Sequence, residues 1–486
     1  MKMTDLQPKV LWQCFDEITK VPRPSKKEGK IIAFLEEFAK KHNLDYTKDA
    51  IGNIVMRKPA TKGYEDRETV ILQSHMDMVC EKNSDVDHDF DKDPIKTIVE
   101  DGWVHAAGTT LGADNGIGCS AEMAILMSDD IEHGPIECLF TVDEETGLTG
   151  AHNIDPEILK GRILLNLDSE DEGEMFIGCA GGKDTQGLFT YTLENAPEGY
   201  IFMDVKVNGL RGGHSGGDIH MQLGNANKII ARFLMKIEEK MPWVLSEIQC
   251  GNLRNAIARE GHAVFGVPMN KKEDVRILLN EFAAVIEFEY KKQDSGVKLH
   301  LETCDASKQV IDQKTKMDML LAVIACPHGV MGMSQEIEGL VETSTNLASI
   351  KMVENNGILV GTSQRSSVES LKDAVCEQVA ACFRLAGAKV IHSDGYPGWA
   401  PNTDSAILKV AEETYEELFH KKPLVKAIHA GLECGLFLEK YPYLDMVSFG
   451  PTMKDVHSPS ERMEIKTVEM WWDHLLLMLK RIPKAK

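Results

Sequence analysis

Two short apolar runs that end in carboxylates constrain this chain more than any other feature. Residues 138–142 are followed by three acidic residues at 143–145, and residues 163–167 are followed by Asp168. Runs of this length and composition are typical of buried strands. Carboxylates gathered where buried strands end lose hydration and repel one another, so they favour a cation between them. An isolated Glu-Glu pair is usually a solvated surface pair, so the prediction of a divalent metal site depends on the rest of the chain.

Composition limits the classes of function. The chain has 486 residues, 43% of them hydrophobic and 27% charged, as expected for a soluble globular protein of two or three domains. A formal net charge of −22 disfavours nucleic acid or an anionic membrane as partner and favours a small solute. The eleven cysteines include no C-x-x-C pair, which argues against a disulfide framework or a cysteine zinc cluster. Without an apolar N-terminal segment or a run of eighteen apolar residues, a cytoplasmic location is expected.

The order of the expected elements indicates one domain interrupted by another. Two helices are predicted within 5–20 and 25–43, separated by Pro22-Arg23-Pro24-Ser25, and the acidic stretch at 81–102 is expected to be a loop. Residues 201–392 repeat one succession of helices and strands, which indicates an internal duplication. The pairs Asn252-Leu253 and Asn346-Leu347 are matched in this alignment.

The predicted fold class is therefore α/β. One discontinuous domain is expected to consist of residues 1–182 and 393–486, and residues 183–392 are expected to form an inserted, internally duplicated α+β domain.

Histidine and carboxylate side chains fall at successive strand ends and loops. A Zn²⁺ or Mn²⁺ site that activates water uses imidazole and carboxylate ligands and leaves room for the water. The residues that offer this set are His75, Asp114, Glu145, Asp168 and His457. Each alone has a structural explanation, because a lone histidine is usually hydrogen-bonded within the fold and an aspartate in a glycine turn usually caps it. Together they predict two divalent ions that share Asp114 at a spacing of roughly 3.5–4 Å.

Two further carboxylates have predicted catalytic roles. Asp77 lies two residues after His75 on the same side of an extended segment, so it can accept the second imidazole N–H and fix the tautomer. Glu144 directly precedes Glu145 and is left without a metal, which makes it the predicted general base.

Five blocks of the sequence resemble one enzyme family. They are Ser74-His75-Met76-Asp77, Gly112-Ala113-Asp114-Asn115-Gly116, Asp143-Glu144-Glu145-Thr146-Gly147, Leu167-Asp168 and His457-Ser458-Pro459. They resemble the motifs of the di-zinc exopeptidases of the aminoacylase and carboxypeptidase type. The segments T-V-D-E-E-T-G-L-T-G-A and L-N-L-D-S-E and the doubled inserted domain are most similar to the cytosolic Xaa-His (carnosine-cleaving) dipeptidases of that family.

The resemblance implies a di-zinc catalytic domain and an inserted lid domain. One zinc would be held by His75, Asp114 and Asp168, and the other by Asp114, Glu145 and His457; Asp77 and Glu144 would be the catalytic partners. A cis peptide bond is expected between Asp114 and Asn115. Mn²⁺ and Co²⁺ remain alternatives to Zn²⁺.

The resemblance also implies substrate contacts in the inserted domain. The loop Gly212-Gly213-His214-Ser215-Gly216-Gly217 resembles the loop of the family's oxyanion-stabilising lid histidine, although this chain lacks the proline that usually follows. Arg365 resembles the family's carboxylate-binding arginine, with a surface salt bridge as the alternative explanation. Asn255 and Glu433 are further expected substrate contacts.

The function implied is a cytoplasmic metallo-dipeptidase that hydrolyses Xaa-His dipeptides, carnosine-like ones included, with a water between two zinc ions. A di-zinc aminoacylase or aminotripeptidase of the same clan is the alternative, and an inactive binding protein on this fold is a more distant one. Small dipeptides are the expected partners, and the sequence leaves both a monomer and a homodimer open.

Overall fold

The chain folds into two units, as seen in a computed structural model that describes residues 2–485. The first unit contains the residues up to Gly178, Pro401–Ala427 and the residues from Leu432 onward; the second contains Cys179–Ala400 and Ile428–Gly431. The expected boundary at 182/183 lies four residues after the junction at 178/179, and the expected boundary at 392/393 lies eight residues before the junction at 400/401. The short return of Ile428–Gly431 was not expected; it is held by the Ala180 amide, which donates to the carbonyls of Ile428 and Ala430.

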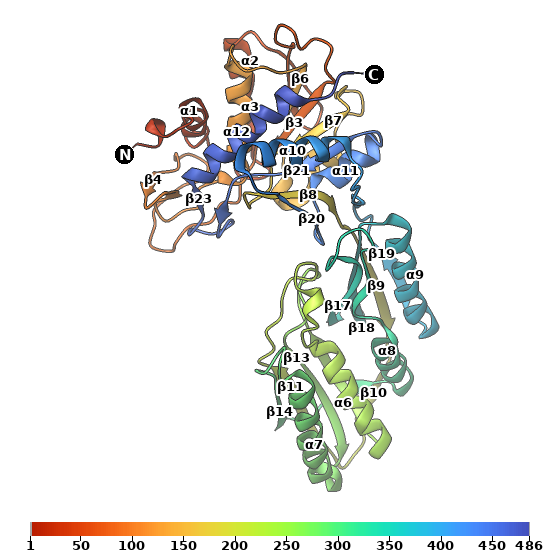
Figure 1. The fold of residues 1–486 in the computed structure, drawn as a ribbon. Coiled ribbons are helices and arrows are strands. Elements are labelled where there is room, and N and C mark those ends of the chain that lie inside the picture. The colour runs from red at the N-terminus through yellow and green to blue at the C-terminus, as the bar shows by residue number, and fades with distance from the viewer. Residues whose placement is uncertain (1, 486) are drawn as a thin grey trace. The chain divides into compact units, whose positions relative to one another are not determined.

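Parallel strands form the centre of the first unit (Figure 1). Its eight-stranded sheet has the order β1-β2-β6-β3-β7-β21-β8-β20, in which β6, β3, β7 and β21 run parallel. Every residue of β3, β6 and β7 is buried, as expected for parallel strands covered on both faces. The bounds are β1 Asp45–Lys48, β2 Ile54–Lys58, β3 Val70–His75, β6 Ile136–Thr141, β7 Ile163–Asn166, β8 Glu174–Cys179, β20 Leu424–Ile428 and β21 Asp445–Ser448.

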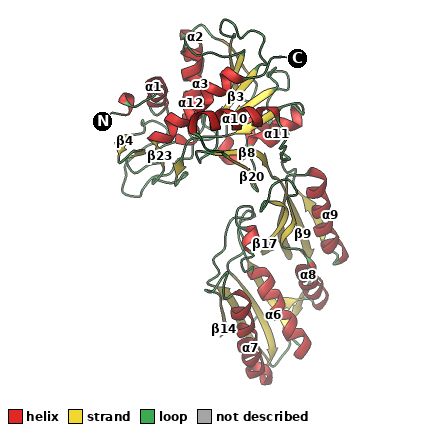
Figure 2. Cartoon of the chain, viewed as in Figure 1, coloured by secondary structure: helices red, strands yellow, loops and turns green. Residues whose placement is uncertain are grey.

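Helices cover this sheet, and α3 among them is buried almost all round (Figure 2). Helix α3 packs on β3 and against α1, and α10 packs on β21 and against α12. The bounds are η1 Met3–Asp5, α1 Lys9–Ile18, α2 Gly29–Lys41, α3 Ala113–Met127, α4 Glu144–Gly147, α5 Thr149–His152, α10 Ala406–Phe419, α11 Glu433–Lys440 and α12 Ile465–Arg481. Within residues 2–485, every helix is too short or too polar to cross a lipid bilayer.

A small second sheet corrects one expectation in the first unit. Its order is β22-β23-β5-β4, with β4 Thr97–Glu100, β5 Trp103–Ala106, β22 Met453–Lys454 and β23 Arg462–Glu464. The stretch 81–102 was expected to be a loop throughout, but its last residues form β4. Strand β4 is only four residues long and alternates half-buried and exposed positions, so its apolar signal is weak.

The second unit has a palindromic strand order, which agrees with the predicted duplication. Its sheet runs β14-β11-β13-β12-β17-β18-β9-β19. Read outward from the centre, each half has a hairpin (β12-β13 or β17-β18), then the first strand of that half in the sequence (β11 or β9), then its last strand (β14 or β19). Strands β12 and β17 meet at the centre, where Cys250 pairs with Ile350. The helices repeat the pattern, since α7, α6, α8 and α9 pack in that order.

The elements of the second unit have the following bounds. The strands are β9 Gly181–Thr190, β10 Leu193–Asn195, β11 Tyr200–Asn208, β12 Val244–Cys250, β13 Gly261–Pro268, β14 Lys298–Thr303, β15 Gln309–Ile311, β16 Gly329–Met333, β17 Val341–Val353, β18 Gly357–Ser366 and β19 Lys389–His392. The helices are η2 Ile219–Met221, α6 Ala226–Lys240, η3 Met269–Lys271, α7 Lys272–Tyr290, α8 Gln313–Ala325 and α9 Glu369–Leu385. The matched Asn-Leu pairs are not equivalent, because Leu253 follows β12 and is 59% exposed whereas Leu347 is fully buried in β17.

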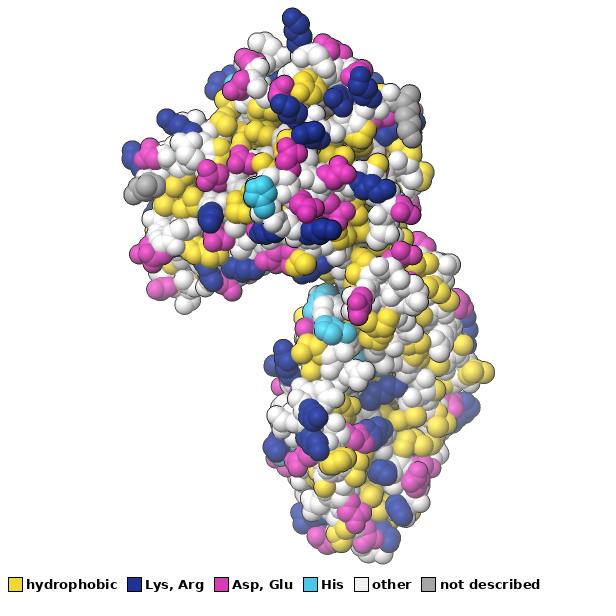
Figure 3. Space-filling view, in the orientation of Figure 1, with side chains coloured by type: hydrophobic (Ala, Val, Ile, Leu, Met, Phe, Trp, Pro, Cys, Tyr) yellow, Lys and Arg dark blue, Asp and Glu magenta, His cyan; other side chains and the backbone are white. Residues whose placement is uncertain are grey.

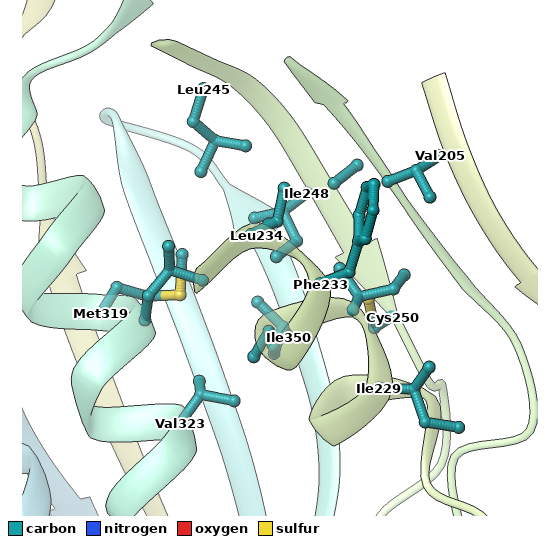
Figure 4. Close-up of a cluster of buried hydrophobic side chains, with 14 of the residues drawn as sticks. Val205, Ile229, Phe233, Leu234, Leu245, Ile248, Cys250, Met319, Val323 and Ile350 are labelled. Atoms are coloured by element: carbon teal, nitrogen blue, oxygen red, sulfur yellow. The ribbon is translucent and has the colours of Figure 1, made fainter. Parts of the chain in front are cut away.

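Helix α6 closes the apolar core of the second unit. Phe233 and Leu234 of α6 and Met319 of α8 face Ile248 and Ile350 of the two central strands, and all five side chains are fully buried (Figure 4). Burial of this core stabilises the sheet on which the loops of the second unit are built.

On the face of the molecule drawn in Figure 3, acidic and basic side chains are interspersed.

A buried histidine makes the first unit sensitive to acid. His474 of α12 lies within hydrogen-bond distance of the Ala411 carbonyl (3.0 Å) and the Thr414 hydroxyl (3.1 Å), and burial lowers its pKa to about 4. The unfolded chain binds this proton near pH 6.5, so the contribution of His474 to stability is present above pH 6.5 and is lost as the pH falls toward 4.

We expect this loss to be of order 2–3 kcal/mol between pH 7 and pH 4.5. Urea denaturation of the wild type and of His474→Gln at both pH values measures it. The variant should lose less stability on acidification than the wild type, and equal losses would contradict the assignment.

Candidate metal centre and substrate site

The predicted ligands of the first unit converge at one edge of its sheet. His75 is the last residue of β3, Glu145 lies in the first turn of α4 just after β6, and Asp168 follows β7 by two residues. Because the carboxyl ends of parallel strands meet at the same edge, these side chains come together. Asp114 reaches the same place from the first turn of α3, and His457 from the loop between β22 and β23.

The two oxygens of Asp114 face different histidines. Asp114 Oδ1 lies 2.9 Å from His75 Nε2, which is also 3.4 Å from Asp168 Oδ1. Asp114 Oδ2 lies 3.0 Å from His457 Nε2, which is also 3.0 Å from Glu145 Oε2. Ligand atoms around a tetrahedral zinc lie roughly 3.3 Å apart, because each is about 2.0–2.1 Å from the ion. The five side chains therefore form two sets of three that share Asp114.

A buried oxygen and the electrostatics of these sets fit bound cations. Glu145 Oε1 is buried and has no hydrogen-bond partner within residues 2–485. Burial and the Asp114 carboxylate raise the pKa of Asp168 to about 6, although His75 opposes them. Hydrogen bonds to Asp114 and Glu145 raise the pKa of His457 to about 11. Crowded carboxylates raise the proton affinity of one another and of a neighbouring imidazole, and a bound divalent ion relieves their repulsion as a proton does.

Asp77 lies between His75 and the loop that carries Glu144 and Glu145. Its Oδ1 lies 3.4 Å from His75 Nδ1 and accepts a hydrogen bond from the Glu144 amide at 3.0 Å, and its Oδ2 accepts one from the Glu145 amide at 3.3 Å. Burial acts to raise the pKa of Asp77, but the nearby His75 imidazole and the hydrogen bonds from Ser25 and the Glu144 amide hold it below its ordinary value. An ionised Asp77 can keep the proton of His75 on Nδ1 and leave Nε2 available to a metal.

Glu144 belongs to neither set. Burial raises its pKa well above the ordinary value, and the carboxylates of Asp168, Glu433 and Glu145 act in the same direction, against His75. An uncoordinated carboxylate with a raised proton affinity beside the ligands has the properties of a general base.

The turn that presents Asp114 is held by a buried carboxylate. The backbone amides of Leu111, Gly112, Ala113 and Asp114 donate to the Glu461 carboxylate over 2.8–3.4 Å. The peptide bond between Asp114 and Asn115 is cis, which confirms the prediction. The Asn115 side chain donates to the Leu167 carbonyl at 3.1 Å and to the Asp168 carboxylate, so it connects the two ligand loops.

In the second unit, a buried arginine lies near two histidines. Arg365, at the end of β18, is 7% exposed; its Nη1 donates to the Tyr396 hydroxyl at 2.9 Å and its Nε to the Ser215 hydroxyl at 3.4 Å. His429 is buried, with Nε2 2.7 Å from the Ser344 hydroxyl; burial, Arg365 and His214 lower its pKa to about 3. These contacts go to neutral hydroxyls, so the buried guanidinium is not a surface salt bridge and its charge is available to an anion.

The loop around His214 fixes the tautomer of its imidazole. His214 Nδ1 accepts hydrogen bonds from the amides of Gly216 (3.2 Å) and Gly217 (3.0 Å), so the proton of the neutral ring is on Nε2. Burial and Arg365 lower the pKa of His214. The Asp218 carboxylate accepts from the His214 amide at 2.8 Å and anchors the loop in which the family's proline is missing. A side chain at Gly216 would meet the His429 carbonyl at 2.1 Å.

Asn255 and Glu433, the other expected substrate contacts, differ in accessibility. Asn255 is exposed, and its carbonyl accepts from the Ser215 amide at 2.8 Å. Glu433 is 1% exposed, and its Oε2 accepts from Gln73 Nε2 at 2.6 Å and from the Thr141 hydroxyl at 2.9 Å. Burial raises the pKa of Glu433 to about 8. The role of both residues in binding substrate stays a prediction.

Several residues around these sites carry no signal in the sequence. Arg23, Ser25 and Glu461 support the ligand loops, and Tyr396 and His429 lie beside Arg365. The spacing of Glu461, four residues after His457, is the only local clue among them.

Comparison with known proteins identifies the family. The sequence matches peptidase family M20/M25/M40 over residues 71–480. It is 40% identical over 482 residues to the cytosol non-specific dipeptidase of Escherichia coli K12, covering 99% of each chain. The structure superimposes on aminoacylhistidine dipeptidase from Vibrio alginolyticus with a TM-score of 0.94 and 43% identity, covering 100% of this chain and 99% of the other.

A more distant structure, aminopeptidase PepT from Bacillus cereus, shares the fold, with a TM-score of 0.57 and 15% identity over 98% of this chain and 99% of the other. The predicted fold class and the prediction of a peptide-bond hydrolase are therefore confirmed. The chain belongs to the peptidase family M20/M25/M40.

Proposed function

We propose that this chain is a two-metal dipeptidase of the cytoplasm that prefers Xaa-His dipeptides, carnosine-like ones included. The single observation that carries the proposal is the division of Asp114, whose two oxygens face two separate sets of histidine and carboxylate ligands. Sites that share one carboxylate between two ions are suited to hydrolysis by an activated water.

The five ligands would hold two divalent ions. His75 and Asp168 would hold one ion, Glu145 and His457 the other, and Asp114 would be shared. Bound at these positions, Zn²⁺, or Mn²⁺ or Co²⁺ in its place, would supply a Lewis acid for the substrate carbonyl and lower the pKa of a water.

Glu144 moves the proton. It takes one from the attacking water and delivers it to the nitrogen of the leaving amino acid, so the same carboxyl acts as base and then as acid. Asp77 keeps the His75 ring oriented through the contact of 3.4 Å between His75 Nδ1 and Asp77 Oδ1.

The second unit is the proposed lid, which binds the substrate. Arg365, with Ser215 and Tyr396 beside it, binds the C-terminal carboxylate, since a guanidinium with free donors matches a carboxylate in shape and charge. His214 donates from Nε2 to the developing oxyanion, because its Nδ1 is already occupied by two amides.

The two similar proteins have names of different breadth. One is called a non-specific dipeptidase and the other an aminoacylhistidine dipeptidase, and both names support a dipeptide as substrate. Purified protein loaded with Zn²⁺, Mn²⁺ or Co²⁺ should be assayed on Xaa-His dipeptides, other dipeptides, N-acyl amino acids and tripeptides. Highest kcat/KM on Xaa-His dipeptides is the expected result; highest kcat/KM on acyl amino acids or tripeptides would indicate an aminoacylase or aminotripeptidase.

We expect Arg365→Met to lower kcat/KM for dipeptides by roughly 10- to 150-fold, because a hydrogen bond to a charged group contributes about 1.5–3 kcal/mol. The loss should be much smaller on dipeptide amides, which lack the carboxylate. Arg254→Met is a matched control, since Arg254 is an exposed arginine of the same unit paired with Asp184 at 3.3 Å. Equal losses on dipeptides and their amides would show that Arg365 does not bind the carboxylate.

A further inference from the structure

A short segment between α1 and α2 contacts three loops: the loop after β3, the turn before α3 and the loop after β6. Its sequence, Pro22-Arg23-Pro24-Ser25, marks only a break between two helices. In the structure, Arg23 is 2% exposed; its Nη1 donates to the Asp77 carbonyl at 2.8 Å and to the Met76 carbonyl at 3.2 Å, and its Nη2 donates to the Gly112 carbonyl. One guanidinium thus joins the loop after His75 to the turn before Asp114.

The glycines of that turn make room for the guanidinium. A Cβ at Gly112, where φ is +69°, would lie 2.5 Å from Arg23 Nη2, and a Cβ at Gly116 would lie 2.7 Å from the same atom. Distances below 3.0 Å are not tolerated without movement. The approach of Arg23 therefore explains the glycine at position 116, and at Gly112 it adds to the left-handed backbone and to the Met78 sulfur, 2.7 Å from an added Cβ.

Two more side chains of the same segment contact the loops of the metal centre. The Ser25 hydroxyl donates to Asp77 Oδ2 at 2.7 Å. The Glu28 carboxylate accepts from the Asp143 amide at 3.1 Å and from the Lys26 amide at 2.8 Å, which fixes the loop immediately before Glu144. Residues 23–28 thus contact all three loops that carry or adjoin the proposed metal ligands.

We propose that Arg23 and Ser25 are positioning residues that hold the ligand loops at metal-binding spacing before the ions arrive. Arg23 fixes the separation between His75 and Asp114 through backbone carbonyls, and Ser25 fixes the carboxylate that orients His75. Neither residue belongs to the two proposed ligand sets, since Arg23 donates to backbone carbonyls and Ser25 to Asp77. This inference rests on the proposed two-metal site, and it concerns how tightly that site binds ions rather than the reaction itself.

The test compares metal affinity in full-length variants. Arg23→Lys keeps the charge and removes the fork that reaches two loops at once, and Ser25→Ala removes one hydrogen bond. Arg57→Lys is the matched control, because Arg57 also bridges a backbone carbonyl (Ile158, 2.7 Å) and a buried carboxylate (Glu137, 3.2 Å). Mn²⁺ and Zn²⁺ binding is measured by calorimetric titration, and amide hydrogen exchange in the metal-free proteins reports on residues 75–78 and 111–115.

We expect Arg23→Lys to lower metal affinity by roughly 10- to 100-fold, the range for loss of a partner that orients metal ligands. Ser25→Ala should lower it several-fold, and Arg57→Lys should not change it. Exchange at 75–78 and 111–115 should be faster in Arg23→Lys alone, and saturating metal should restore most of its kcat. A generally misfolded variant would not recover in this way.

Each other outcome overturns a stated claim. If the wild type binds two ions and Arg23→Lys binds them as tightly, the inference is wrong and the proposed function stands. If Arg23→Lys fails to fold, Ser25→Ala decides, and wild-type affinity in that variant overturns the inference. If the wild-type chain binds no divalent ion, the proposed function fails and the inference fails with it.

Discussion

Glu144→Gln should lower the rate of dipeptide hydrolysis by about 10²- to 10⁴-fold, the loss typical for removal of a general base. The substitution keeps the shape of the side chain and removes the oxygen that takes the proton. Because Glu144 belongs to neither ligand set, both ions should stay bound. The measurements are kcat on an Xaa-His dipeptide and metal content by atomic emission after dialysis.

Glu145→Gln is the comparison that separates the two neighbouring glutamates. Glu145 Oε2 lies 3.0 Å from His457 Nε2, and its buried Oε1 has no hydrogen-bond partner among the residues that the structure describes, so this variant should release one ion. Near-normal activity in Glu144→Gln, or metal loss as large as in Glu145→Gln, would mean that the roles are assigned the wrong way round.

Asp114→Asn should weaken the binding of both ions, whereas Asp168→Asn should weaken one. The two oxygens of Asp114 face His75 at 2.9 Å and His457 at 3.0 Å, while Asp168 belongs to the set of His75, at 3.4 Å. An amide offers one neutral oxygen in place of two charged ones. The loss of affinity at each position should exceed the roughly 10- to 100-fold effect of losing an outer partner.

Stepwise titration of each variant with Mn²⁺ gives the number and affinity of the sites. One strong site in Asp168→Asn and none in Asp114→Asn is the expected pattern. If Asp114→Asn retained one site at wild-type affinity, Asp114 would serve a single ion and the division of ligands would have to be redrawn.

The convergence of the candidate metal ligands could be predicted from the sequence because its signals are local. Apolar runs followed at once by carboxylates identify strand ends, and parallel strands place those ends at one edge without any knowledge of distant contacts. His75 and Asp168 were found in this way. Asp114 lies in the first turn of α3 and His457 in a loop, and both are predicted by their residue type and by the family's motifs.

The residues that support the centre could not be predicted because their contacts are distant in the sequence. Arg23 and Gly112 are 89 positions apart, and Glu461 and Leu111 are 350 apart, so no local pattern connects them. Strand β4 was missed for another reason, since it pairs at the margin of the fold and only half-buries its apolar residues. The strand order agrees with the predicted duplication, but the matched Asn-Leu pairs are not equivalent, because one pair lies in a loop and the other in a strand.

The close approach of Arg23 to Gly112 and Gly116 has a consequence for how these positions evolve. A side chain at either glycine would occupy the space of the guanidinium, since its Cβ would lie 2.5 Å (Gly112) or 2.7 Å (Gly116) from Arg23 Nη2. Positions 23 and 116 should therefore vary together: a homologue with alanine at the position of Gly116 should carry a shorter side chain at the position of Arg23. Gly112 should stay glycine in either case, because its φ of +69° and the Met78 sulfur, 2.7 Å from an added Cβ, also exclude a side chain there. Introducing alanine at Gly116 here should be tolerated better in an Arg23→Ala background than alone.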